Sequence, residues 1–226
     1  TMAVVLGGGG GDSSPLREIG DFNPAMLVHG EQAIALHKPL PVAATVRSQS
    51  TITGIYDKGK AALVTLASTA LDAADDQPMF TSTSSLFIRG EGGWGGDRGP
   101  ASDWIRPERA ADEIISYETR PDQALLYRLN GDRNPLHSDP SFAALGGFDK
   151  PILHGLCTYG FTGRALLHAV CGSDPAIFRA MSGRFSSPVM PGEKLSVHIW
   201  DTDDGALFET MVGDRTVLSA GTLSTG

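Results

Sequence analysis

The segment GDRNPLHSD, which begins at residue 131, holds residues whose types and spacing suit proton chemistry. Gly131 permits a tight turn and Pro135 fixes its own φ, so the loop is expected to be short and stiff. The Asp132 carboxylate and the His137 imidazole, five residues apart, can then converge on one water molecule, with Asn134 between them. Asp132 can accept a proton while His137, whose charge changes near neutral pH, orients the water or passes a proton.

Two other interpretations of this loop stay open on the residues alone. In the first, the loop is a plain turn in which Asp132 acts as a cap and His137 is a surface residue. In the second, His137 and Asp139 bind a metal ion, although no further group of ligands accompanies them. We favour the pair without a metal.

A second candidate is Gly155, which follows His154 at the start of a helix predicted over residues 155–170. The first N–H of a helix has no intrahelical partner, and the helix dipole favours negative charge there. A ligand oxygen that gains charge during a reaction can take this bond, and such a donor contributes roughly 3 kcal/mol. The alternative is that Gly155 only permits close packing of the helix on a sheet.

Two glycine patterns match known phosphate-binding motifs in spacing but not in context. GEGGWG at residues 90–95 has the spacing of a dinucleotide fingerprint, yet Pro100 and polar residues follow where a helix should begin. GIYDKGKA at residues 54–61 fits most of a phosphate loop, yet Ala61 replaces the required Ser or Thr. We expect a hairpin turn there, with Lys58 as an exposed cation.

The elements that must position these residues follow a repeated order. Residues 26–36 are predicted to form a short helix, because their apolar positions fall at mixed helical spacings. Glycine-rich residues 7–14 are predicted to form a flexible loop. The other predicted elements are strands at 43–55, 61–72, 79–89 and 114–120, helices at 123–129, 141–145 and 155–170, and strands at 176–185, 194–201, 207–212 and 216–223.

Each half therefore reads as a helix followed by an antiparallel meander, an α+β arrangement. His29-Gly30 and His154-Gly155 would begin the two helices, which indicates a duplicated unit. Composition shifts to Gly, Asp, Arg and Pro between residues 90 and 107, so we place the domains at 1–100 and 101–226.

Composition excludes several classes of protein. The 226 residues carry a net charge of −8, which argues against a general nucleic-acid surface. No apolar run is long enough for a membrane helix, and no secretory signal is evident, so we expect no membrane association. The two cysteines give no disulfide framework, which favours a reducing compartment.

With these residues placed, the chain resembles the hydratase 2 family, the MaoC-like (R)-specific enoyl-CoA hydratases that also occur within peroxisomal multifunctional enzymes. GDRNPLHSDPSFAALGGFDKPILHGLCTYGF is similar to the family signature, and LVHGEQ, KPLP and DKGK resemble its N-terminal half. The resemblance covers the chain from about residue 15 onward. It implies a double hot-dog fold, in which each half is a long helix wrapped by an antiparallel sheet.

The resemblance also implies roles for single residues. Asp132 and His137 would activate water, Asn134 would help to place it, and the N–H of Gly155 would bind the thioester oxygen. The residues expected to contact the acyl-CoA are His29, Gly30, Lys58, Arg133, Pro135, Leu136 and Phe185. Two-domain members carry a further stretch before the first helix that has little counterpart here, which puts acyl-chain preference in doubt.

The expected function is hydration of trans-2-enoyl-CoA to (3R)-3-hydroxyacyl-CoA, with no cofactor beyond the CoA of the substrate. The alternatives are an acyl-carrier-protein 3-hydroxyacyl dehydratase, a hot-dog thioesterase, or a noncatalytic acyl-CoA-binding subunit. The partner is expected to be an acyl-CoA thioester, and the assembly a homodimer. The ending LSTG lacks a peroxisomal tripeptide, which leads us to expect a cytoplasmic protein.

Overall fold

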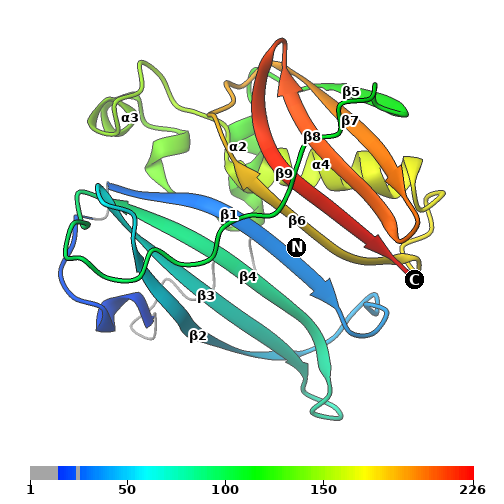
Figure 1. Cartoon of the computed structure of the whole chain (residues 1–226), viewed down its shortest axis with the longest axis horizontal. Coiled ribbons are helices and arrows are strands. Elements are labelled where there is room, and N and C mark those ends of the chain that lie inside the picture. The colour runs from blue at the N-terminus through cyan, green and yellow to red at the C-terminus, as the bar shows by residue number, and fades with distance from the viewer. Residues whose placement is uncertain (1–14, 24–25) are drawn as a thin grey trace.

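A single antiparallel sheet joins the two halves of the chain. The structure, a computed structural model, describes residues 15–23 and 26–226, so the loop predicted at residues 7–14 lies outside the described part. Nine strands of the described residues pair in the order β2-β3-β4-β1-β6-β9-β8-β7-β5. Strands β1 (Leu27–Leu36) and β6 (Phe178–Phe185) lie side by side at the centre, where the halves meet (Figure 1).

The remaining elements follow the predicted order closely. In the described first half they are η1 (Pro15–Glu18), β2 (Val46–Asp57), β3 (Ala61–Asp72) and β4 (Pro78–Arg89). In the second half they are β5 (Glu113–Glu118), α2 (Gln123–Tyr127), η3 (Arg128–Asn130), η4 (Pro135–His137), α3 (Pro140–Leu145), α4 (Gly155–Ala169), β7 (Lys194–Thr202), β8 (Gly205–Val212) and β9 (Arg215–Thr225).

The helix predicted over residues 26–36 is wrong, because this segment forms strand β1. Ile34 lies opposite Ser82 of β4 on one side and opposite Met181 of β6 on the other. Pairing on both edges satisfies the backbone N–H and C=O groups of β1, and this tertiary contact outweighs a weak local preference. His29-Gly30 therefore lies in a strand while His154-Gly155 opens a helix, so the proposed match between two helix starts is also wrong.

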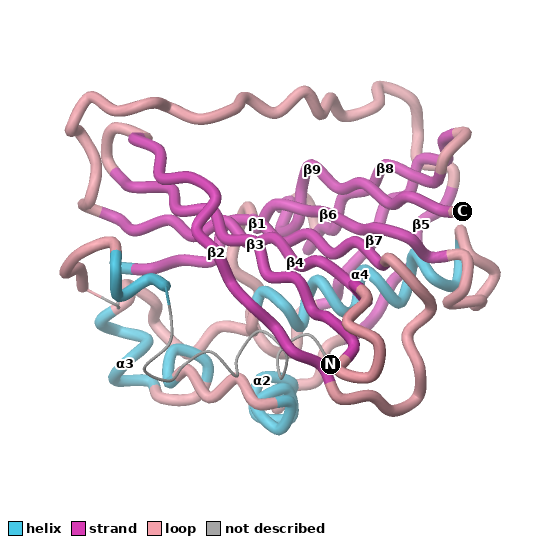
Figure 2. Tube along the Cα trace, turned by 90° about the horizontal axis from the view of Figure 1, so that it is seen from below, coloured by secondary structure: helices cyan, strands magenta, loops and turns pink. Residues whose placement is uncertain are grey.

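Helix α4 supplies the core of the second half. Its buried Tyr159 and Leu166 pack in one cluster with Met181 of β6 and Phe208 of β8. Figure 2 shows that α2, α3 and α4 all lie on one side of the sheet. In the described first half, by contrast, η1 is the single helical segment beside the strands, so the expected long helix per half is found here for the second half alone.

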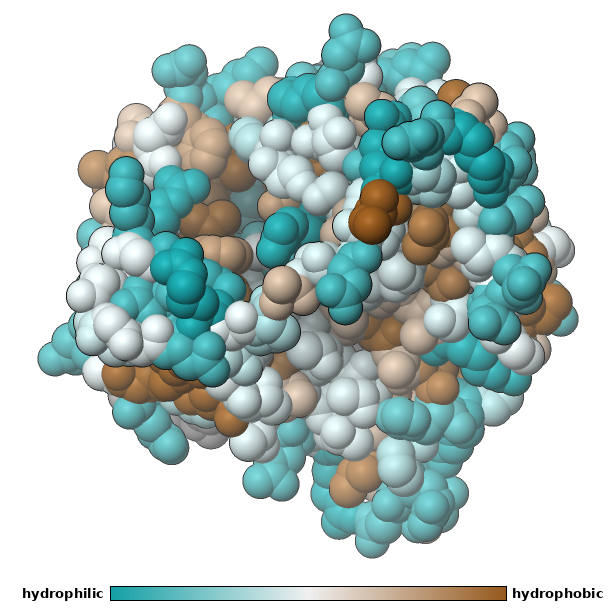
Figure 3. All heavy atoms as spheres, viewed as in Figure 1, coloured by the Kyte–Doolittle hydropathy of each residue, from teal (hydrophilic) through white to brown (hydrophobic). Residues whose placement is uncertain are grey.

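The linker between β4 and β5 crosses the opposite face of the sheet (Figures 1 and 2). The indole N–H of Trp104 donates to the carbonyl of Gly221 at 3.0 Å, and Arg106 pairs with Glu209 at 2.9 Å. Figure 3 shows this face with hydrophilic residues spread over it and apolar residues in small separate groups. The composition shift at residues 90–107 thus falls on a strap over the shared sheet; the domain division at residue 100 stays a prediction.

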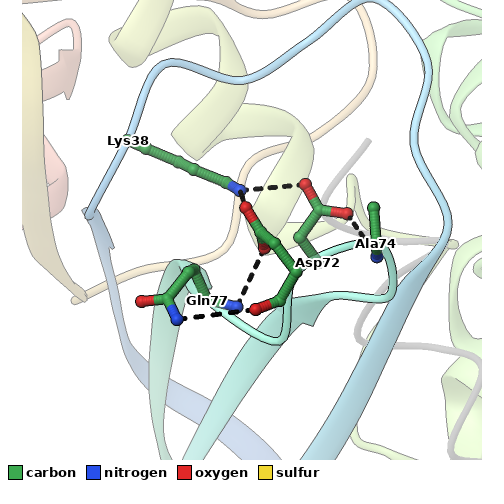
Figure 4. A network of polar contacts seen from close by, with 5 residues as sticks. Lys38, Asp72, Ala74 and Gln77 are labelled. Carbon is green, nitrogen blue, oxygen red and sulfur yellow. Dashed lines mark hydrogen bonds and ion pairs between the residues drawn. The ribbon is translucent and has the colours of Figure 1, made fainter.

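A polar network closes the end of the first-half sheet (Figure 4). Lys38 donates to Asp72 at 2.9 Å and to Asp75 at 3.2 Å, which joins the loop after β1 to the turn between β3 and β4. Asp72 also accepts the N–H of Ala74, and Asp75 accepts the N–H of Gln77. Exposed ion pairs of this kind contribute little free energy, so the network mainly fixes the path of the loop.

The described helices include no candidate for a membrane span, since none is both long and apolar enough.

Candidate active site

The loop that carries Asp132 is shaped by its own side chains. Gly131 ends η3 with φ of 108°, a left-handed conformation that favours glycine. The Asp132 carboxylate accepts the N–H of Asn134 at 3.1 Å, and the Asn134 side-chain oxygen caps η4 by accepting the N–H of Leu136 at 3.0 Å. Asn134 therefore holds the loop in shape, and its predicted contact with water stays a prediction.

His137 ends η4 and is 9% exposed. Its Nδ1–H donates to the carbonyl of Ile152 at 2.8 Å, which leaves the lone pair of Nε2 free on the other edge of the ring. Burial lowers the pKa of His137, against the opposing effect of the Asp132 charge. The imidazole is therefore neutral near pH 7 and can accept a hydrogen bond from water.

The carboxylate and two imidazoles meet in one place. One side-chain ligand atom from each of Asp132, His137 and His154 lies within 4.8 Å of the others. The His154 ring stacks on the His137 ring with centroids 3.8 Å apart, and the Tyr127 ring lies 4.7 Å from it. Burial, helped by the neighbouring His137, lowers the pKa of His154 to about 4.

The sequence argument placed Asp132 and His137 together and missed His154 and Tyr127. The sequence marks His154 as the residue before Gly155 and as part of the repeated His-Gly pair, with no role of its own in the chemistry. One signal in the sequence could have identified His154. It directly precedes the helix start that is predicted to bind the ligand, and packing alone would accept an apolar residue there.

This cluster does not suit a metal ion held by both rings. The two imidazole planes are only 29° apart, so their nitrogen lone pairs point side by side, whereas metal ligands must converge on one point. In the alternative pair of His137 and Asp139, one oxygen of the Asp139 carboxylate is already engaged by the backbone. Asp139 caps α3, where its carboxylate accepts the N–H groups of Ser141 at 2.8 Å and Phe142 at 3.3 Å.

The start of α4 presents a free donor beside the cluster. The N–H groups of Cys157 and Thr158 both turn back to the carbonyl of His154, and among the described residues the N–H of Gly155 has no backbone acceptor. A Cβ at Gly155 would lie 3.1 Å from the Phe185 ring, so the glycine keeps a narrow approach open. Gly155 and Phe185 thus lie against each other, and their contact with the acyl-CoA stays a prediction.

The first half contributes His29 to the same place. The His29 ring meets Phe185 edge-on with centroids 5.0 Å apart. Burial lowers the pKa of His29, against the opposing effects of its bond to the carbonyl of Glu31 and of the Asp132 charge. Gly30 follows at a β-bulge, where a Cβ would lie 2.6 Å from the Phe87 ring, so the strand packs closely there; its contact with the acyl-CoA stays a prediction.

The remaining predicted contacts with the acyl-CoA are Lys58, Arg133, Pro135 and Leu136. Lys58 is in the turn after β2, and its ammonium group donates to the carbonyl of Arg98 in the linker. Arg133 and Pro135 are exposed and Leu136 is half-buried. Substrate contact by these four residues, Lys58 included, stays a prediction.

A cavity of about 420 Å³ opens in the first half, away from Asp132 and His137. It lies between residues 19–22, which follow η1, the end of β2, the first part of β3, the end of β4 and the first residues of the linker after β4. Its apolar lining includes Ile19, Phe22, Val64, Ile88 and Trp94.

Comparison with known proteins agrees with this architecture. Residues 105–222 match the family model of the MaoC like domain, and residues 1–90 match that of the MFE-2 hydratase 2 N-terminal domain. A helix wrapped by an antiparallel sheet, joined through β1 and β6 to a second sheet half, defines a double hot-dog protein. The chain belongs to the MaoC-like family, in its hydratase 2 branch with this N-terminal domain.

Individual relatives give the extent of the likeness. A Mycobacterium tuberculosis protein named 3-hydroxyacyl-thioester dehydratase Y is 49% identical over 86% of this chain and 69% of its own length. A Dictyostelium discoideum protein named probable enoyl-CoA hydratase 2 is 44% identical over 80% of this chain and 62% of its own. The solved MaoC-like dehydratase of Phytophthora capsici superposes with a TM-score of 0.86 at 36% identity, covering 95% of this chain and 74% of that one. The chain thus spans about two thirds of the length of these two curated relatives.

Proposed function

We propose that this protein is an (R)-specific enoyl-CoA hydratase, which adds water reversibly to trans-2-enoyl-CoA to give (3R)-3-hydroxyacyl-CoA. The observation that carries the proposal is the convergence of Asp132 and His137 beside the free N–H of Gly155. The names of the relatives, an enoyl-CoA hydratase 2 and a 3-hydroxyacyl-thioester dehydratase, describe the two directions of one such reaction and support it.

The reaction follows from the two acceptors. The Asp132 carboxylate and Nε2 of His137 each accept a hydrogen bond from the same water, which leaves the water oxygen's lone pair free for C3 of the substrate. As the oxygen bonds to C3, one water proton passes to this pair and the double-bond electrons move toward the thioester. C2 then takes a proton from the pair, so that one H and one OH have been added.

The thioester oxygen carries the charge that develops on the way. In the proposal, the N–H of Gly155, at the positive end of the α4 dipole, binds that oxygen. The rings of His29 and Phe185 lie against each other, and Phe185 lies beside Gly155. Through His29 the first half would therefore help to exclude bulk water from the reacting bond. The reaction involves no net oxidation or reduction, so it calls for no redox cofactor, and we expect no cofactor beyond the CoA of the substrate.

The assembly and location remain expectations. We propose a homodimer, which light scattering coupled to size-exclusion chromatography tests by a mass twice that of the chain. We retain the cytoplasm as the proposed location; one relative is named a peroxisomal enoyl-CoA hydratase 2, so imaging of a tagged protein in its host is the suitable test.

The direct test of the reaction uses isotopically labelled water and a medium-chain trans-2-enoyl-CoA. We expect the label in the 3-hydroxyl group of an intact acyl-CoA. A label in a free carboxylate, with release of CoA, would instead identify a thioesterase. Binding of the substrate without any product would identify the noncatalytic alternative.

A further inference from the structure

The burial of His154 carries a free-energy penalty for folding. Its side chain is 1% exposed, and its Nδ1 is a buried polar atom without a hydrogen-bond partner among the described residues. Such an atom destabilises the folded state, whereas an aromatic ring of similar shape would not. A residue that costs stability at this place is expected to serve the reaction rather than the fold.

The contacts of His154 define what it can do. Its Nε2–H points at the backbone carbonyl of Asp132, 3.4 Å away, and its ring lies against the ring of His137. One side chain therefore touches both members of the reacting pair, from α4, whose first N–H is the proposed thioester donor. It ties the Asp132 loop, η4 and the start of α4 together at one point.

We infer that His154 is a positioning residue for hydration, which holds the Asp132 carboxylate and the His137 imidazole in register with the N–H of Gly155. This inference rests on the proposed function. His154 does not touch the reacting water. It remains neutral, donates through Nε2 to the carbonyl of Asp132, and supports the His137 ring through stacking.

Two substitutions separate these contacts. His154→Phe keeps a stacked ring and removes the donor to Asp132. His154→Gln keeps a donor near the position of Nε2 and removes the stacked ring. The matched control is His168→Phe, the same change on the exposed side of α4, where Ser173 is the one hydrogen-bond partner of the His168 ring among the described residues.

The experiment measures kcat, KM and Tm of the full chain with a medium-chain 2-enoyl-CoA. For His154→Phe we expect kcat to fall at least about 10-fold, KM to change little, and Tm to stay level or rise because the orphaned Nδ1 is gone. His154→Gln is expected to lower kcat as well, and His168→Phe to match the wild type. The stacked ring of His154 should shift the NMR resonance of a His137 ring proton in the wild type. We expect this shift to remain in the Phe variant, which keeps a ring, and to disappear in the Gln variant.

Two results would overturn the inference. If His154→Phe turns over substrate at the wild-type rate, His154 is only a filler of space. If both variants lose Tm and kcat together, its role is structural. An inactive but folded wild type would instead refute the proposed function itself, so the two failures are distinguishable.

Discussion

At the scale of single residues, the account depends on two side chains of different chemistry facing one water. Asp132→Asn removes the carboxylate that accepts a proton, and His137→Gln removes the imidazole lone pair. We expect each change to lower kcat by at least roughly 100-fold, as the loss of a positioned acid or base usually does. The control is Asp139→Asn, which preserves an oxygen able to cap α3 outside the site. Near-normal turnover by either site variant would show that the pair is misassigned.

The burial of His137 predicts a pH dependence. Its pKa is lowered in the folded protein, so the neutral ring persists below the usual pKa of about 6.5 and is lost only as the pH falls through the lowered value. The acid limb of kcat/KM in the free enzyme should therefore have its midpoint below pH 6.5. A midpoint above 6.5 would mean that His137 is more exposed to water, or closer to negative charge, than its contacts indicate.

The sequence alone identifies the residues of this candidate site more readily than it predicts how they are arranged in space. GDRNPLHSD indicated the Asp132–His137 pair, and the helix start indicated Gly155. Whether the pair faces one water depends on the bond from His137 to Ile152, whose partner lies 15 residues away and has no local signature. The contact of His29 with Phe185 is longer in range still, because it requires β1 and β6 to be neighbours.

At the scale of elements, Asp57 explains the glycine pattern at residues 90–95. This buried carboxylate accepts the N–H groups of Gly59 at 2.7 Å, Gly93 at 2.8 Å and Gly95 at 2.7 Å. A Cβ at Gly92 would lie 2.6 Å from the backbone N of Ala61. The glycines thus let the linker fold around Asp57 beside the turn that bears Lys58, which gives their spacing a structural reason.

Asp57→Asn should loosen this part of the linker. Its N–H bonds, chiefly those from Gly93 and Gly59, lower the pKa of Asp57 to about 2, so the stabilisation is present above the unfolded pKa near 3.9 and is lost as pH falls toward 2. In the Asn variant at pH 7, the side-chain NH2 group would face the N–H of Gly95, so two donors would meet and this hydrogen bond would be lost. We expect a lower Tm and faster amide exchange at Gly95.

The matched control for that change is Asp97→Asn, because the exposed Asp97 carboxylate bonds only to the N–H of Gly99. Equal Tm values for the Asp57 and Asp97 variants would show that the Asp57 contacts do not hold the linker.

In the first half, local residue preferences predicted one strand correctly and failed for another. Residues 61–72 form a strand with the predicted bounds, and Val64, Thr65 and Thr69 there favour a strand locally. Residues 27–36 contain Glu, Gln, Ala and Leu, which favour a helix, and they form a strand because β4 and β6 flank them. Long-range pairing of this kind is invisible to any local window.

At the scale of the whole molecule, the central pairing of β1 with β6 makes the two halves one structural unit. Glu31 of β1 also pairs with Arg184 of β6 at 3.0 Å. We therefore expect urea to unfold both halves in one transition, with the same midpoint for Trp94 fluorescence in a Trp104→Phe, Trp200→Phe background and for far-UV circular dichroism. A separate, earlier transition of Trp94 would show that the first half unfolds independently.

Both halves of the shared sheet contribute to the proposed site. The acceptor pair and the proposed thioester donor come from the second half, and His29 of the first half contacts Phe185. We therefore expect the bound substrate to present one face of its double bond to the water. The most direct test is the configuration of the product from a medium-chain trans-2-enoyl-CoA, determined with dehydrogenases specific for each 3-hydroxyacyl-CoA enantiomer. The account predicts (3R)-3-hydroxyacyl-CoA. A purely (3S) product, or no product from fully folded protein, would contradict it.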